Sequence, residues 1–196
     1  MTNKDQIRKI TLTAILSTIL VVLAFLPIKT LGLEITLTII PIAIGGIIGG
    51  VWVGTILGTI FGLISFIQCF GYSAFGVVLL DISPLMTFLV CLPTRILVGF
   101  IPALLYKVLK AKNIDKNIAS GIACVLTPVL NTVLFMSVLV LGFYNTEYIQ
   151  GFVDYLGAKN PFTFVILFVG INGLVEIICA VVVTFPVVKA LDKYIR

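Results

Sequence analysis

Long apolar runs dominate this chain and constrain its fold more than any other feature. They lie at residues 10–28, 35–70, 85–106, 117–144 and 162–188. A membrane core about 30 Å thick is crossed by about 20 consecutive apolar residues in a helix. Only 11% of the residues are charged, and the mean hydropathy is +1.24. The sequence therefore predicts an integral membrane protein made of helices, because barrel strands would show short segments of alternating polarity.

The run at 35–70 is too long for one crossing, since it would make about 54 Å of helix. The basic residues indicate where it divides, because they favour the cytoplasmic side of a membrane. The chain has three clusters of basic residues. If all three lie in the cytoplasm, the chain must cross the membrane an even number of times between the first cluster and the second. We therefore expect a turn near Gly49–Val51. The clusters are Lys4, Arg8 and Lys9; Lys107, Lys110, Lys112 and Lys116; and Lys189, Lys193 and Arg196.

The expected fold is all-α, with one transmembrane domain over residues 1–196. It is an integral membrane bundle of six transmembrane helices, and both termini are cytoplasmic. The connections Lys29–Glu34, Gly71–Pro84 and Asn145–Pro161 then lie on the outer side, and the last is long enough to fold over a pocket. The first run is expected to stay in the mature chain, because no small-residue cleavage site follows it.

Arg95 stands at the middle of the apolar run at 85–106. A guanidinium group cannot lose its proton, and a charge at mid-bilayer costs about 2.5–3.5 kcal/mol on the mildest insertion scale. Such a residue is retained where it faces a partner or a polar cavity. Two interpretations are open. One is a structural ion pair with Glu176, the only other deeply placed charge, and the other is a binding site for an anionic solute.

Polar side chains on other predicted helices could share a site with Arg95. Asn131 lies deep in the fifth helix, Gln68 ends the third, and Asn172 and Glu176 share one face of the sixth. For each amide alone, a hydrogen bond between helices is the more common role. Taken with the two charges, they exceed what helix packing needs. We therefore expect these side chains to converge on one polar pocket that binds the substrate.

Two aromatic residues, Tyr72 and Phe75, lie in the stretch FGYSAFG at the outer membrane boundary. An aromatic belt at the interface is the simpler interpretation. The alternative is a segment that walls or caps the pocket, and both residues are candidate binding residues on that ground.

A glycine recurs every four residues along the run at 35–70. Small residues at this spacing let helix backbones approach closely, and packing is favoured over contact with a ligand. The same glycines permit the expected turn. They are Gly46, Gly50, Gly54, Gly58 and Gly62.

The absence of histidine removes the usual general base, and with it most zinc and haem sites. With one deep carboxylate, an intramembrane enzyme is disfavoured, so we expect no catalytic residue, no metal and no cofactor. A purely structural membrane subunit remains an alternative. The cysteines all fall in apolar stretches and are expected to pack rather than to form disulfides or bind metal. They are Cys69, Cys91, Cys124 and Cys179.

This arrangement resembles the substrate-binding S component of an energy-coupling factor (ECF) vitamin transporter. The likeness rests on six helices in under 200 residues, on the opening IRKITLTAILSTIL and on the stretch IIPIAIGGIIGGVWVGTILGTIFGLISF. The run FGYSAFGVVLLDISPLMTFLVCLPTRILVGFIPALLY looks most like the pantothenate-type members. The resemblance implies a multi-pass protein of a prokaryotic plasma membrane. It also implies partners, a transmembrane coupling subunit (T component) and two cytoplasmic ATPases that hydrolyse the ATP.

The family's coupling contact is an alanine-x-x-x-alanine pattern on the first helix. Here the pattern reads Ala14-Ile-Leu-Ser-Thr18, so the second alanine is replaced by threonine. The resemblance implies that Ala14 and Thr18, with Ser17 beside them, contact the coupling subunit.

For pantothenate, Arg95 would take the carboxylate through a charge-assisted pair. Asn131, Asn172 and Gln68 would meet the hydroxyls and the amide. Alternatives are an S component for another vitamin or precursor, such as riboflavin, folate, pyridoxine or hydroxymethylpyrimidine. A stand-alone secondary transporter is a further alternative, although the chain shows no repeated halves.

Overall fold

The computed structural model describes residues 3–26, 29–30, 33–34 and 36–195, with the backbone alone at 29–30, 33–34, 171–172 and 192–195. The described part is helical apart from one antiparallel ribbon of two short strands. Its elements are α1 (Asn3–Ala24), β1 (Lys29–Thr30), β2 (Leu33–Glu34), α2 (Ile39–Gly49), α3 (Val51–Gln68), α4 (Ala74–Ile82), α5 (Pro84–Ala111), α6 (Lys116–Phe143), α7 (Glu147–Leu156) and α8 (Pro161–Ile195).

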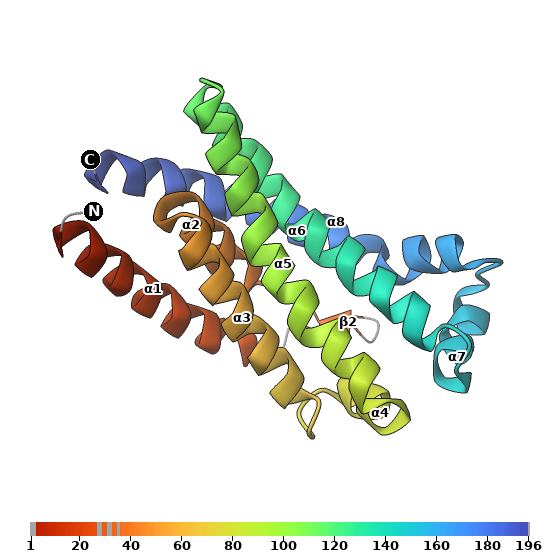
Figure 1. The fold of residues 1–196 in the computed structure, drawn as a ribbon. Helices are drawn as coiled ribbons and strands as arrows, with labels where there is room; N and C mark the ends of the chain where they lie inside the picture. The colour runs from red at the N-terminus through yellow and green to blue at the C-terminus, as the bar shows by residue number, and fades with distance from the viewer. Residues whose placement is uncertain (1–2, 27–28, 31–32, 35, 196) are drawn as a thin grey trace.

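The helical membrane architecture predicted from the apolar runs is confirmed. Within the described residues, five segments are long and apolar enough to cross a membrane: α1, α3, α5, α6 and Gly173–Leu191 of α8. A bent pair, α7 followed by Pro161–Gly170, raises the number to six if it counts as one span. Figure 1 shows both chain ends at the end of the bundle that carries the α2–α3 and α5–α6 turns, while α4 and α7 lie at the opposite end.

The run at 35–70 divides where the sequence predicts, at Gly50, whose φ of +87° is readily adopted by glycine. The first half is shorter than expected. Helix α2 has 11 residues, which amounts to about 16 Å and so to roughly half of a membrane core. The predicted second span is therefore helical over only part of its depth.

The sixth predicted helix, expected as one span over 162–188, is broken. Gly170 has φ +35° and ψ −122°, which interrupts α8. The part before this break and α7 meet at 74°. Hydropathy could not reveal the break, because the run stays apolar on both sides of a residue whose backbone turns.

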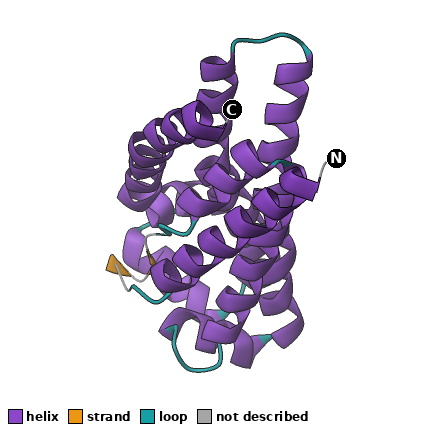
Figure 2. Ribbon diagram, turned by 90° about the vertical axis from the view of Figure 1, so that its left-hand side faces the viewer, coloured by secondary structure: helices purple, strands orange, loops and turns teal. Residues whose placement is uncertain are grey.

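Two connections expected on the outer side contain helices. Ser73 begins α4 by accepting a hydrogen bond from the Gly76 N–H at 3.3 Å. Thr146 does the same for α7 with Ile149 at 3.4 Å, and Gly157 ends that helix in the left-handed conformation. These capping residues explain why the segments fold as helices. Figure 2 shows the same bundle from the side, with helices making up nearly all of the ribbon.

The glycine repeat packs α3 against α5, as the spacing predicts. A Cβ placed on Gly58 would lie 2.4 Å from the carbonyl oxygen of Arg95, and one on Gly99 would lie 2.1 Å from that of Gly54. Only glycine allows backbones to come this close. The contact holds the Arg95 segment of α5 directly beside α3, and so fixes the position of the guanidinium group.

Candidate binding pocket

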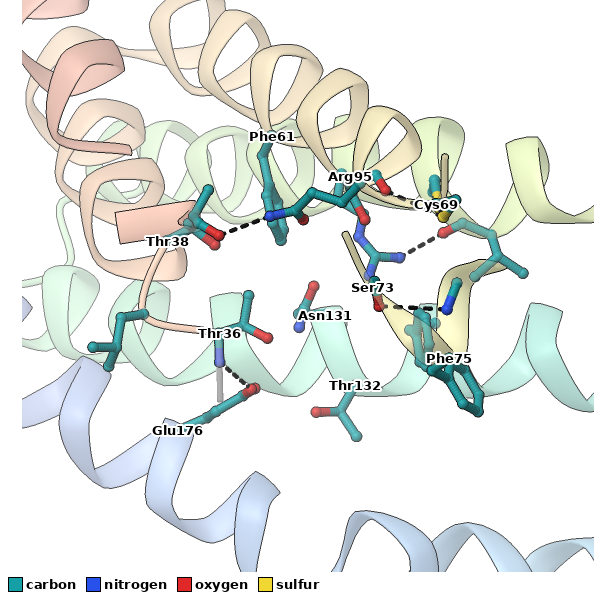
Figure 3. A pocket seen from close by; sticks show the side chains of 18 of the residues that line it. Thr36, Thr38, Phe61, Cys69, Ser73, Phe75, Arg95, Asn131, Thr132 and Glu176 are labelled. Carbon is teal, nitrogen blue, oxygen red and sulfur yellow. Dashed lines mark hydrogen bonds between the residues drawn. The ribbon is translucent and has the colours of Figure 1, made fainter. Parts of the chain in front are cut away.

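A cavity of about 160 Å³ lies among the helices and takes its lining from α1, α3, α4, α5, α6, α8 and the segment that precedes α2. Five of the seven residues predicted to bind the substrate line it: Gln68, Phe75, Arg95, Asn131 and Glu176. Figure 3 shows four of these, Phe75, Arg95, Asn131 and Glu176, around the same space.

Arg95 is 7% exposed, and its guanidinium group contacts carbonyl, hydroxyl and aromatic groups. Nη1 donates hydrogen bonds to the Val90 carbonyl and, at 3.0 Å, to Thr94 Oγ1. The rings of Phe61 and Phe135 stand 5.4 Å and 4.8 Å from the guanidinium carbon, within cation–π range. Among the described residues, Nε has no hydrogen-bond partner. The side chain is thus held in place while part of its hydrogen-bonding capacity stays unused.

Glu176 reaches across the fold to the segment before α2. Its Oε1 accepts a hydrogen bond of 2.7 Å from the backbone N–H of Thr36, 140 residues away in sequence. The described side chains of Glu176 and Arg95 form no direct ion pair, so the structural pair considered from the sequence is not present. Figure 3 shows Thr36 and Glu176 together on the side of the cavity opposite Phe61.

Two further buried polar atoms on the cavity wall lack a hydrogen-bond partner in the described part of the chain. They are Asn131 Oδ1 and Thr38 Oγ1. A buried polar atom left without a partner costs about 1–3 kcal/mol. With Arg95 Nε, the wall therefore presents one cationic donor, one amide acceptor and one hydroxyl. A solute with matching groups would satisfy all three.

Gln68 and Tyr72 hold the end of α1. Gln68 Nε2 donates to the Ala24 carbonyl at 2.7 Å, and Tyr72 Oη donates to that of Phe25 at 3.0 Å. Tyr72 is 45% exposed and does not line the cavity. Asn172 lies in α8, and its side chain is outside the described residues. The structure therefore does not bring Tyr72 to the cavity wall, and the prediction for Asn172 lies outside the described side chains.

Phe75 joins the cavity to an aromatic cluster at the same end of the bundle. Its ring centroid lies 5.8 Å from that of Tyr148, 6.2 Å from that of Phe152 and 6.0 Å from that of Phe168. Helix α7 supplies two of these rings. The segment predicted to fold over a pocket therefore packs behind one of the residues that line it.

Sequence reasoning missed most of the cavity lining, including Phe61, Phe135, Thr36 and Thr38. A signal existed for Phe135, since it follows Asn131 by four residues and shares its helix face. Phe61 stands within the glycine repeat, where packing masks any other role. Nothing in the sequence marks the two threonines, because they precede a helix and reach the cavity through the course of the backbone.

The first-helix residues predicted to contact a coupling subunit face away from the bundle or lie at its edge. Ala14 and Thr18 are exposed, and Ser17 is half-buried. Thr18 Oγ1 donates to the Ala14 carbonyl at 3.0 Å, so its hydroxyl is satisfied within the helix. This face is open to lipid or to another helix.

A protein-family model described as "ECF transporter, substrate-specific component" matches residues 8–188. The match spans α1 through most of α8 and includes every residue of the cavity wall. A search among curated proteins found no match.

Proposed function

Because the chain belongs to the family of substrate-specific components of ECF transporters, we propose that it is the pantothenate-binding subunit of such a transporter. Members of this family are multi-pass proteins of prokaryotic plasma membranes. They bind a small substrate and pair with a T component and ATPases, and they have no catalytic activity of their own. The identity of the substrate and the residues that hold it are the proposal.

The observation that carries the proposal is the set of buried polar atoms without partners around the cavity. Pantothenate offers a carboxylate, two hydroxyls and one amide. Its carboxylate would pair with Arg95 through charge-assisted hydrogen bonds. Its hydroxyls and amide would pair with Asn131, Thr38 and the carboxylate of Glu176. The aromatic rings of Phe75 and Phe135 would cover its methyl groups.

The position of the only tryptophan disfavours a large aromatic vitamin that needs a wide stacking surface. Trp52, the only tryptophan, is 80% exposed and begins α3 at the turn after Gly50. It lies at the end of the bundle opposite α4, so it offers no stacking surface to a ligand in the cavity.

In the proposed topology both termini are cytoplasmic and the cavity opens toward the outer side. The two chain ends and the α5–α6 turn, which carry the basic clusters, lie at one end of the bundle (Figure 1). Such clusters favour the cytoplasm. The end with α4 and α7 would then face outward.

Uptake of labelled pantothenate into membrane vesicles tests the proposed function. We expect accumulation only when the T component, both ATPases and ATP are present, because the chain has no energy source of its own. Riboflavin should not compete. Accumulation by this chain alone would contradict the assignment to a transporter subunit, and competition by riboflavin would contradict the substrate.

Replacing Ala14 by tryptophan should separate binding from transport. The bulky ring would hold the partner helix away where close approach is needed. Pantothenate binding should survive, because Ala14 is not part of the cavity wall. ATP-driven uptake should fall to the level seen without the T component.

The matched control for Ala14→Trp is Ile19→Trp. Ile19 is 44% exposed and lies about 140° around the same helix. It should leave uptake unchanged. Equal uptake by both variants would place the coupling surface elsewhere.

A further inference from the structure

Two thiols from different helices meet in the cavity wall. Cys69 directly follows α3, Cys91 lies in α5, and their Sγ atoms are 3.8 Å apart. Both residues line the cavity and are only 4% and 5% exposed. The other two cysteines, Cys124 and Cys179, do not line it. A packing role alone does not call for two sulfur atoms side by side beside a binding pocket.

The local structure gives this pair the freedom to close. A disulfide joins sulfur atoms about 2.05 Å apart, so the two must approach each other by about 1.8 Å. Cys69 is the C-cap residue directly after α3, and helix ends open most easily. Gly76 of α4 lies against it, since a Cβ there would come within 2.7 Å of Cys69 Sγ. The missing side chain of Gly76 leaves room for the thiol.

The surroundings also favour reaction. Arg95 follows Cys91 by four residues and shares its helix face. A fixed positive charge near a thiol favours the thiolate, which is the nucleophile in thiol–disulfide exchange. The cavity offers a small reagent a route to both sulfur atoms. In the proposed topology this route opens outward, away from the thiol pools that keep cytosolic cysteines reduced.

We propose that Cys69 and Cys91 are a redox-modification site of the binding pocket, oxidised by a small-molecule disulfide and restored by a thiol. The Cys91 thiolate attacks the reagent's S–S bond, forms a mixed disulfide and releases one reagent thiol. The Cys69 thiolate then attacks the Cys91 sulfur, forms the protein disulfide and releases the second. The protein loses two electrons and two protons, and the reagent's disulfide becomes two thiols.

Oxidation would change the pocket because Cys69 lies at the start of a segment that lines it. The segment after it contributes Ser73, Phe75 and Gly76 to the lining. Joining Cys69 to Cys91 draws the start of this segment toward α5 and narrows the space beside Arg95. This consequence rests on the proposed function, so we expect the oxidised protein to bind pantothenate more weakly.

The first test needs no pantothenate. The ligand-free protein, carrying Cys124→Ala and Cys179→Ala, is treated in detergent with 2-hydroxyethyl disulfide and digested without reduction. The expected result is a peptide crosslinked between Cys69 and Cys91 and a loss of two hydrogens from the intact mass. Adding Cys91→Ser should leave only a reagent adduct on Cys69. Reagent adducts on both cysteines without a crosslink, or reaction only after denaturation, would overturn the proposal.

The second test titrates pantothenate into the reduced, oxidised and re-reduced forms of the same protein. Oxidation should lower the affinity by about tenfold or more, which corresponds to about 1.4 kcal/mol, and reduction should restore it. A complete crosslink with unchanged affinity would overturn the effect on the pocket. If the reduced form does not bind pantothenate, the proposed function is wrong. The redox proposal is then still tested by the crosslinking experiment, which uses no pantothenate.

Discussion

Replacing Arg95 by methionine is expected to weaken pantothenate binding strongly while the fold survives. Methionine can fill the space of the aliphatic part of arginine, and without the guanidinium group the variant no longer bears the cost of burying a charge without a counterion. Losing one partner of a buried charged contact costs about 2–5 kcal/mol, which is about 30-fold to 5,000-fold in affinity. Isothermal titration of the purified variant measures this directly. Arg95→Lys should bind with intermediate affinity, since it keeps the charge and loses the planar fork.

The control for Arg95→Met is Leu97→Met on the same helix. Leu97 is 39% exposed on the outside of the bundle, so its replacement should leave binding unchanged. Size-exclusion chromatography and the helical circular dichroism of both variants show whether they fold. A folded Arg95→Met protein that binds pantothenate with wild-type affinity would rule out the proposed role of the guanidinium group.

The second large effect is expected from adding a single methyl group at Gly99. The new Cβ would lie 2.1 Å from the Gly54 carbonyl oxygen and 3.2 Å from Gly58 Cα. These are backbone atoms, so the strain is relieved only by moving α3 away from α5. Overpacking of this kind costs about 1–3 kcal/mol or more, a large share of a typical stability of about 5–15 kcal/mol. Gly99→Ala should therefore unfold at a clearly lower temperature in detergent and should also bind less pantothenate.

Gly151→Ala is the matched substitution, because nothing lies within 4 Å of a Cβ at that position. It should be neutral or slightly stabilising, since alanine favours helices over glycine. Equal thermal stability of the Gly99 and Gly151 variants would show that the α3–α5 contact is not as close as described.

The helical membrane fold follows from the sequence because it depends on side-chain polarity. Run length and the basic clusters predict the turn at Gly50. The shortness of α2 and the break at Gly170 escape prediction, because apolar residues continue through both. Helices α4 and α7 lie in segments that the apolar runs assign to connections. They form because Ser73 and Thr146 cap their first turns.

In the candidate site too, the features that depend on side-chain polarity are predictable from the sequence and the tertiary contacts are not. Arg95, Asn131 and Glu176 are conspicuous because each is polar at the depth of an apolar run, and the structure brings all three to one cavity. Their contacts follow from tertiary structure alone. The bond from Thr36 to Glu176 joins residues 140 positions apart, and no sequence periodicity indicates such a pair.

Titration of the purified protein with pantothenate and with pantothenol, its neutral alcohol analogue, tests the central claim most directly. The two molecules differ only in the carboxylate that Arg95 is proposed to bind. We expect pantothenate to bind one molecule per chain and pantothenol to bind far more weakly, with little difference between the two in Arg95→Met. Equal affinity of the wild-type protein for both molecules, or binding of neither, would contradict the account.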